Sequence, residues 1–179
     1  MLSLGACLVD DTDIQFYREI KPVSCYFIED AMRVGSLGLN CLNGVTGEEY
    51  DPRGPYFNPG KVLILLGDKG DTPSNVMSDF ASWIRVNTRG CIPVEAAFPI
   101  KFDGMYTAWY FDNFYQEKNP LGFGGEDIGS FYRGLSSNPQ ASLGKLGVED
   151  KRNPPHNALQ DAIYQAEQFA EILKLIPKK

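Results

Sequence analysis

The sequence predicts an α/β domain in which helices flank a mixed β-sheet. Two short extended segments, residues 2–9 and 14–20, are separated by a polar turn and favour a β-hairpin. Further along the chain, stretches with helical spacing alternate with one extended apolar stretch, Val94–Phe98. A hairpin followed by alternating helices and strands is typical of layered α/β domains. We therefore expect strand 94–98 to lie in the same sheet as the hairpin.

A single domain covering residues 1–179 is expected. The chain has 179 residues, of which 43% are hydrophobic, and this is enough for one well-packed core. A short helix is predicted over Glu29–Val34. The least regular stretch, about 36–72, is rich in glycine and proline, and we expect an irregular excursion in which only Lys61–Leu66 forms a strand.

The second half of the sequence predicts mainly helices. Thr72 is suited to cap a helix that starts with Pro73. Asp103 opens a helix rich in aromatic residues, and Asp127 begins a short helix as its cap. The strongest helical pattern covers Asn157–Ile176, where apolar residues recur along one face.

Composition limits the classes of function. The formal net charge of −6 argues against a protein that binds nucleic acid by neutralising phosphates with lysine and arginine alone. It does not argue against an enzyme that reaches phosphate through bound metal ions, because the metal then supplies the positive charge.

Cysteine and hydropathy patterns predict an intracellular protein. The four cysteines lie far apart, without a Cys-x-x-Cys pair, and the chain has one histidine, so a zinc site is not expected. Scattered reduced thiols are typical of intracellular proteins. No apolar run approaches the roughly 20 residues of a membrane span. We therefore expect a soluble, cytoplasmic protein that does not associate with a membrane.

The only histidine lies at the start of the C-terminal helix. Asn157 is suited to cap that helix, which leaves His156 just outside the positive end of the helix dipole. This position favours a neutral imidazole, as a general base requires. Asp161, about one turn into the helix, is placed to face a metal ion. The alternatives are that His156 is an ordinary loop residue and that Asp161 only complements the dipole.

Asp103 also has two interpretations. It follows an apolar strand and begins a helix, so it can act as an N-cap, a role worth about 1 kcal/mol. A carboxylate at the end of a strand can equally bind a metal ion. Position alone leaves both interpretations open.

Two segments resemble motifs of the DEDDh family of 3′→5′ exonucleases, which includes ribonuclease T, oligoribonuclease and proofreading subunits of DNA polymerase. The run His-Asn-Ala-Leu-x-Asp-Ala at residues 156–162, followed by Gln165-Ala166, is similar to the third motif of that family. The Phe-Asp pair at 102–103, the aromatic residues after it and Asn-Pro-Leu-Gly at 119–122 resemble the second-motif region. Leu121 stands where some relatives have phenylalanine, and Gly129 stands where they have lysine.

The resemblance implies a ribonuclease-H-like fold and a two-metal hydrolysis of phosphodiester bonds. It implies that His156 is the general base and that Asp103 and Asp161 are catalytic carboxylates that bind Mg²⁺ or Mn²⁺. The expected substrate is nucleic acid with single-stranded 3′ ends, either DNA or RNA, and a homodimer is possible for such an enzyme. Lys145, Lys151 and Arg152, in the loop before His156, are candidate phosphate contacts, although a solvated loop face is the more common role for such residues.

The first family motif, Asp-x-Glu, is not found. In the family it lies on the first, central strand, whereas residues 3–6 resemble the second strand. The resemblance therefore implies an N-terminally truncated chain, with the first central strand missing and activity weak or absent. Asp10, Asp11 and Glu19 do not reproduce the missing pair. The alternative function is a catalytically inert domain of the same fold that binds nucleic acid or protein.

Overall fold

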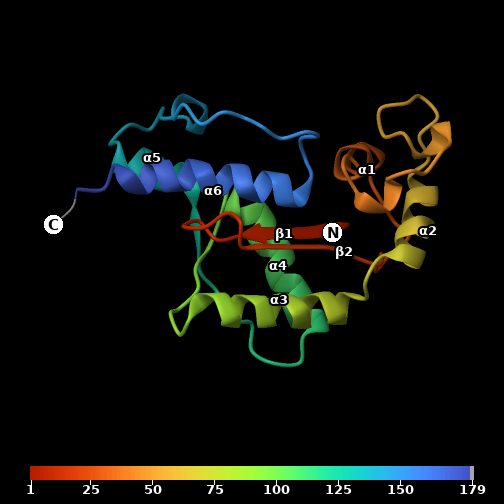
Figure 1. Ribbon diagram of the computed structural model, residues 1–179, viewed down its shortest axis with the longest axis horizontal. Helices are drawn as coiled ribbons and strands as arrows, with labels where there is room; N and C mark the ends of the chain where they lie inside the picture. The colour runs from red at the N-terminus through yellow and green to blue at the C-terminus, as the bar shows by residue number, and fades with distance from the viewer. Residues whose placement is uncertain (178–179) are drawn as a thin grey trace.

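The computed structural model describes residues 1–177 and shows a mixed α/β fold, as expected. Its elements follow one another as β1 (Ser3–Cys7), β2 (Gln15–Glu19), α1 (Glu29–Gly35), α2 (Pro59–Lys69), α3 (Pro73–Thr88), β3 (Glu95–Ala97), α4 (Ile100–Phe114), β4 (Gly125–Asp127), α5 (Ile128–Leu135) and α6 (Ala158–Lys174). Short 3₁₀ turns lie at Asn40–Leu42, Glu48–Tyr50 and Leu143–Lys145. In Figure 1 the β1–β2 hairpin lies between α6 and α3.

The predicted hairpin is confirmed. β1 and β2 are antiparallel, with Ser3 opposite Glu19 and Cys7 opposite Gln15. Because side chains alternate across a strand, Leu4 points to one face of the hairpin and Gly5 to the other. The first face packs against α3 and α4 in the largest hydrophobic cluster, formed by Leu4, Phe16, Ile20, Val76, Met77, Phe80, Ala81, Ile84, Tyr110 and Phe111.

The second face of the hairpin lies directly against α6. A Cβ atom built on Gly5 would lie 2.3 Å from the backbone carbonyl carbon of Ala158, in the first turn of that helix. Real Cβ atoms do not approach backbone so closely. The missing side chain at Gly5 therefore sets the distance between α6 and β1.

The expectation that strand 94–98 joins the hairpin sheet is wrong. β3 pairs in parallel with β4, and the residues that the structure describes form two separate two-stranded sheets. β3 is also shorter than predicted, because Pro93 and Pro99 flank it and proline has no N–H to donate to a ladder. α6 contacts both strand pairs, so both lie against the same helix.

The predicted strand Lys61–Leu66 is also wrong, since these residues lie inside α2. Asn58 caps this helix by accepting a hydrogen bond from the N–H of Lys61, and Pro59 stands at its first position. Val62 and Leu66, four residues apart, are the fully buried side chains on its inner face. A short apolar run can form either a strand or a buried helix, and here the Asn58 cap favours the helix.

Asp103 does not begin its helix, contrary to the prediction. α4 starts at Ile100, with Pro99 in the N-cap position and no side-chain cap. Asp103 therefore lies in the first turn, one residue beyond Phe102. Asp103 therefore does not cap α4.

Residues 29–70 form a helical region with a core of its own. Its buried residues are Met32, Leu39, Cys41, Phe57, Val62 and Leu66, and Figure 1 shows α1 and α2 at one end of the hairpin, apart from the other helices. The carboxylate of Glu19, on β2, accepts hydrogen bonds from the backbone N–H groups of Asn40 and Cys41, the latter at 3.0 Å. These bonds fasten the helical region to the hairpin.

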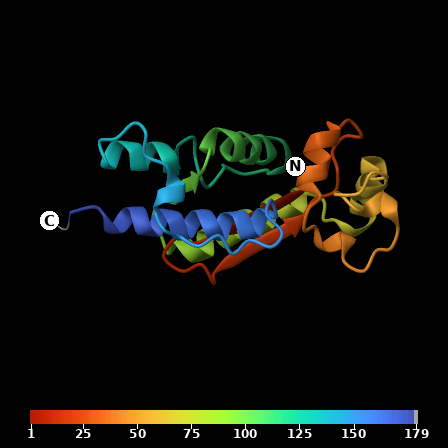
Figure 2. The same cartoon turned by 90° about the horizontal axis from the view of Figure 1, so that it is seen from above.

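A third cluster connects α5 to the C-terminal helix. Ile128, Leu143, Phe169 and Ile172 pack together, so α5 lies alongside α6 (Figure 2). Asp127 caps α5 by accepting a hydrogen bond from the N–H of Ser130 at 2.7 Å, as predicted. No helix within residues 1–177 is both long and apolar enough to cross a bilayer.

Two glycine substitutions should change stability in opposite directions. Gly5→Ala should destabilise the protein by about 3 kcal/mol, at the upper end of overpacking costs, because its methyl group meets immovable backbone of α6. Gly67→Ala, inside α2 with nothing within 4 Å of its Cβ position, should stabilise by about 0.5–1 kcal/mol. Urea unfolding of both variants checks this, and equal effects of the two changes would contradict the close packing of α6 on β1.

Candidate active site

The start of α6 is fixed by Asn157. Its side-chain oxygen accepts hydrogen bonds from the N–H groups of Leu159 and Gln160, both at 3.1 Å, as the predicted N-cap. Its side-chain nitrogen donates to the carbonyl oxygen of Gly38, 2.7 Å away, in the turn after α1. The cap therefore joins the first turn of α6 to the helical region.

His156 lies immediately before this cap, on the rim of the site. Its side chain is exposed, and its backbone φ of +67° is in the left-handed region, where histidine is more frequent than most residues. Its backbone N–H donates to Asp161 Oδ1 at 3.3 Å. Among the described residues its imidazole has no hydrogen-bond partner, so the ring is accessible to solvent and substrate.

Asp103 lies on α4 and Asp161 on α6. Burial, and secondly the negative charge of Asp161, raise the pKa of the Asp103 carboxyl above its ordinary value. A like charge has this effect only at short range. Two sequence-predicted ligands, 58 positions apart in the chain, therefore lie within electrostatic reach of each other.

The sequence interpretation missed a third carboxylate, Glu95 on β3. Burial raises the pKa of Glu95, and the charge of Asp103 raises it further, while a hydrogen bond from Thr107 opposes the shift. The charge of Asp103 thus acts on Glu95, as the charge of Asp161 acts on Asp103. A single acidic residue within the apolar stretch 92–98 was the signal that could have identified it.

Arg152, predicted to contact phosphate, is bound to the site's own carboxylate. Its Nη1 donates to Asp161 Oδ1 at 2.8 Å, and its Nε and Nη2 donate to Asp150. The guanidinium lies over the ring of Tyr164, 4.4 Å from the centroid. A cation that binds Asp161 must therefore compete with this guanidinium or share the carboxylate with it.

The donor groups suit a hard divalent cation only in part. Carboxylate oxygens are the ligands that Mg²⁺ and Mn²⁺ prefer, and Asp103 and Asp161 provide a coupled pair. However, within residues 1–177 no three or more histidine, cysteine, aspartate or glutamate side chains lie close enough together to hold one metal ion. The chemistry of the pair therefore fits a metal, and further oxygen ligands are needed.

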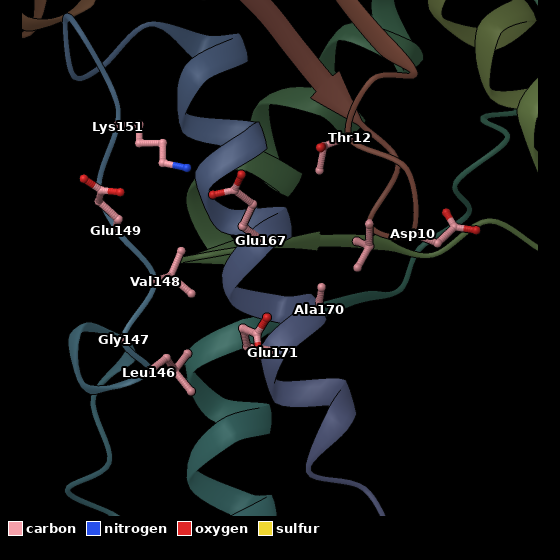
Figure 3. A pocket seen from close by; sticks show the side chains of 11 residues that line it. Asp10, Thr12, Leu146, Gly147, Val148, Glu149, Lys151, Glu167, Ala170 and Glu171 are labelled. Carbon is pink, nitrogen blue, oxygen red and sulfur yellow. The ribbon is translucent and has the colours of Figure 1, made fainter.

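The two lysines predicted to contact phosphate lie away from the carboxylates. Lys145 is exposed in a 3₁₀ turn. Lys151 lines a cavity of about 480 Å³ between the hairpin turn, the 146–151 loop and α6 (Figure 3). The other ionisable side chains of this cavity are Asp10, Glu149, Glu167 and Glu171. These acidic surroundings repel an anion.

Removing the buried charge of Asp103 should stabilise the metal-free protein at neutral pH. Its pKa is higher in the folded state than the ordinary value of 3.8, so the unfolding free energy falls as pH rises through the interval above 3.8. Asp103→Asn should therefore raise the melting temperature at pH 7, and the gain should shrink as pH falls below 3.8.

Calorimetry from pH 3 to pH 7 measures this difference. Asp112→Asn, an exposed change on the same helix, is the matched control and should alter stability by less than about 0.5 kcal/mol. Added Mn²⁺ should stabilise the unchanged protein by mass action but not Asp103→Asn. A variant that is less stable at pH 7 would contradict the buried, mutually repelling arrangement.

Comparison with known proteins supports the chemistry that these residues suggest. No model of a known protein family matches the sequence. Among curated proteins, the chain is 32% identical over 185 aligned positions to the 3′-5′ DNA exonuclease Cap18 of Escherichia coli, and the alignment covers 100% of this chain and 85% of that protein. Identity at this level over the whole chain indicates common descent, and the chain belongs to this family of 3′→5′ exonucleases.

Proposed function

We propose that the protein is a 3′→5′ exonuclease of the DEDDh type that removes nucleotides from single-stranded 3′ ends of DNA. The main support is that the charge of Asp161 on α6 raises the pKa of Asp103 on α4, and that the backbone N–H of His156 donates to Asp161. Cap18, the relative described above, is named as a DNA exonuclease, which favours DNA over RNA.

The proposed fold is ribonuclease-H-like. Its support is the order of elements, in which an antiparallel hairpin is followed by α3, β3, α4, β4, α5 and α6. β1 is paired on one edge only, with β2, and β3 only with β4, within the described residues. One further strand between β1 and β3 would join the two pairs into the mixed sheet of that fold, under α6.

The proposed mechanism assigns a role to each of the three residues. Two divalent ions would help to form hydroxide and stabilise the leaving 3′ oxygen. Asp103 and Asp161 would hold these ions through their carboxylate oxygens. The exposed imidazole of His156 would accept the proton of the attacking water.

We further propose that full activity requires two more carboxylates, on the additional strand. Two carboxylates neutralise and fix two divalent ions less well than four do. The candidates for compensation within the chain are engaged elsewhere, since Glu19 binds backbone N–H groups of the helical region. Asp10 lies in the hairpin turn, beside the acidic cavity of Figure 3.

An inert binding domain is the second candidate function. The observation that favours it is the ion pair between Arg152 and Asp161, in which a side chain of the protein neutralises a proposed metal ligand. Such a domain would bind DNA or a protein without hydrolysing a phosphodiester bond.

Release of mononucleotides from a 3′-labelled DNA strand tests the proposal. We expect weak, Mg²⁺- or Mn²⁺-dependent release by residues 1–179, and faster release when a strand with an Asp-x-Glu pair from a DEDDh exonuclease is added before Met1. In the extended protein, His156→Ala and Asp161→Asn should each lower turnover by about 10²-fold or more, the usual worth of a positioned general base.

Asp150→Asn is the matched control for this experiment. Asp150 shares the Arg152 partner with Asp161 but is exposed, and Arg152 lowers its pKa to about 2. Its substitution should leave most of the turnover. Strong release by residues 1–179 alone would contradict the need for further carboxylates, and DNA binding without release by either protein would favour the inert domain.

A further inference from the structure

A second cavity lies between α5, α6 and the loop 141–144, and arginines rather than carboxylates line it. Its volume is about 340 Å³. Its charged lining residues are Arg133 and Arg152, and no aspartate or glutamate lines it. The carboxylates that pair with these arginines, Asp127 for Arg133 and Asp150 and Asp161 for Arg152, lie outside the lining.

This cavity is continuous with the carboxylate site along α6. Asp161, Gln165 and Gln168 are spaced by four and three residues, so they lie on one face of the helix. Gln165 and Gln168 line the cavity, and Arg152 reaches from the cavity to Asp161. A ligand in the cavity would therefore lie one to two helical turns from the proposed metal ligands.

Gln165 and Gln168 add polar groups to the wall of the cavity. Gln168 is mostly buried, with an exposed fraction of 4%. The Oε1 of Gln165 accepts a hydrogen bond from the backbone N–H of Phe98 at 2.7 Å. A glutamine amide both donates and accepts hydrogen bonds, so Gln168 is a polar group that a ligand in the cavity could contact.

Both arginines keep donors available for such a ligand. A guanidinium has five N–H donors. Arg152 uses three of its donor atoms on two carboxylates, and Arg133 donates from Nη2 to Ser130 Oγ at 2.9 Å. These contacts hold each guanidinium in place and leave further N–H groups unengaged. Guanidinium groups pair with phosphate through parallel hydrogen bonds.

We propose that this cavity binds a nucleotide through its phosphate, with Arg133 and Arg152 as phosphate contacts and Gln168 as a hydrogen-bond partner of the nucleotide. A volume of about 340 Å³ lies near the lower end of ligand pockets and is too large for a bare anion. The half-exposed ring of Phe98, which also lines the cavity, is available to stack on a base.

The identification of the ligand as a nucleotide rests on the proposed function. Two sources share this chemistry, namely the mononucleotide released by the reaction and a nucleotide within the bound DNA strand. Both carry a phosphate and a base, so the cavity chemistry is the same for each.

Calorimetry with a deoxynucleoside 5′-monophosphate, without divalent metal, tests the cavity. Arg133→Met and Gln168→Leu should each weaken binding by at least about tenfold, as expected for loss of a hydrogen bond to a charged group. Arg133 is partly exposed, so its variant should fold even where a change at buried Gln168 is not tolerated. Arg85→Met, a surface arginine paired with Glu117, is the matched control and should bind as the unchanged protein does.

Two further measurements separate the possible outcomes. Inorganic phosphate should bind at least about tenfold more weakly than the mononucleotide, and equal affinities would overturn the assignment to a nucleotide. Displacement of the mononucleotide by an unlabelled single-stranded oligonucleotide identifies the DNA strand as the source, whereas no displacement identifies the released product. Absence of any binding at millimolar mononucleotide would overturn the proposal.

Asp103→Asn distinguishes a failure of this proposal from a failure of the proposed function. It should abolish metal-dependent nuclease activity but leave metal-free mononucleotide binding unchanged. Binding that requires metal and is lost in Asp103→Asn would place the nucleotide at the carboxylates and overturn the cavity proposal. Mononucleotide binding by the extended protein with Asp103 unchanged, without any nuclease activity, would support the cavity while contradicting the exonuclease.

Discussion

The contact between α6 and β1 is the constraint on which the site depends. Gly5 has no side chain, and this lets the first turn of α6 lie directly on the hairpin. The same turn is capped by Asn157, which also binds the carbonyl of Gly38. These contacts fix the axis and the rotation of the helix. They place Asp161 where its charge raises the pKa of Asp103 on the neighbouring helix.

Electrostatics explains the arrangement around that contact. Bringing Asp103 and Asp161 together while partly burying them is unfavourable, and the raised pKa of Asp103 expresses this cost. Arg152 offsets it by pairing with Asp161. A bound divalent ion would offset the same repulsion, so the guanidinium and the ion would each neutralise the same pair of carboxylates.

Local signals predicted those parts of the fold that short segments determine. Thr72 and Asn157 correctly indicated where α3 and α6 begin, because a cap and its helix are neighbours in sequence. The short apolar run 61–66 fits a strand as well as a buried helix, so its sequence alone does not determine which one forms. The burial of Val62 and Leu66 on one side, which distinguishes a helix from a strand, depends on the rest of the fold. The resemblance identified the family, but the Arg152–Asp161 pair and the cavity around Gln168 arise from contacts between separate segments, which spacing along the chain does not report.

The double attachment of the helical region has a consequence for cooperativity. Residues 29–70 are joined to the rest of the molecule at two places, through Glu19 and through the bond from Asn157 to Gly38. Transient opening of this region would break the second attachment and loosen the segment that carries His156. Opening of the helical region and disorder of the His156 segment are therefore linked equilibria. The two segments then unfold together, as one local unit of the structure. Hydrogen exchange at the amides of Asn40 and Cys41, distant in sequence from α6, would therefore report how often the His156 segment leaves its place.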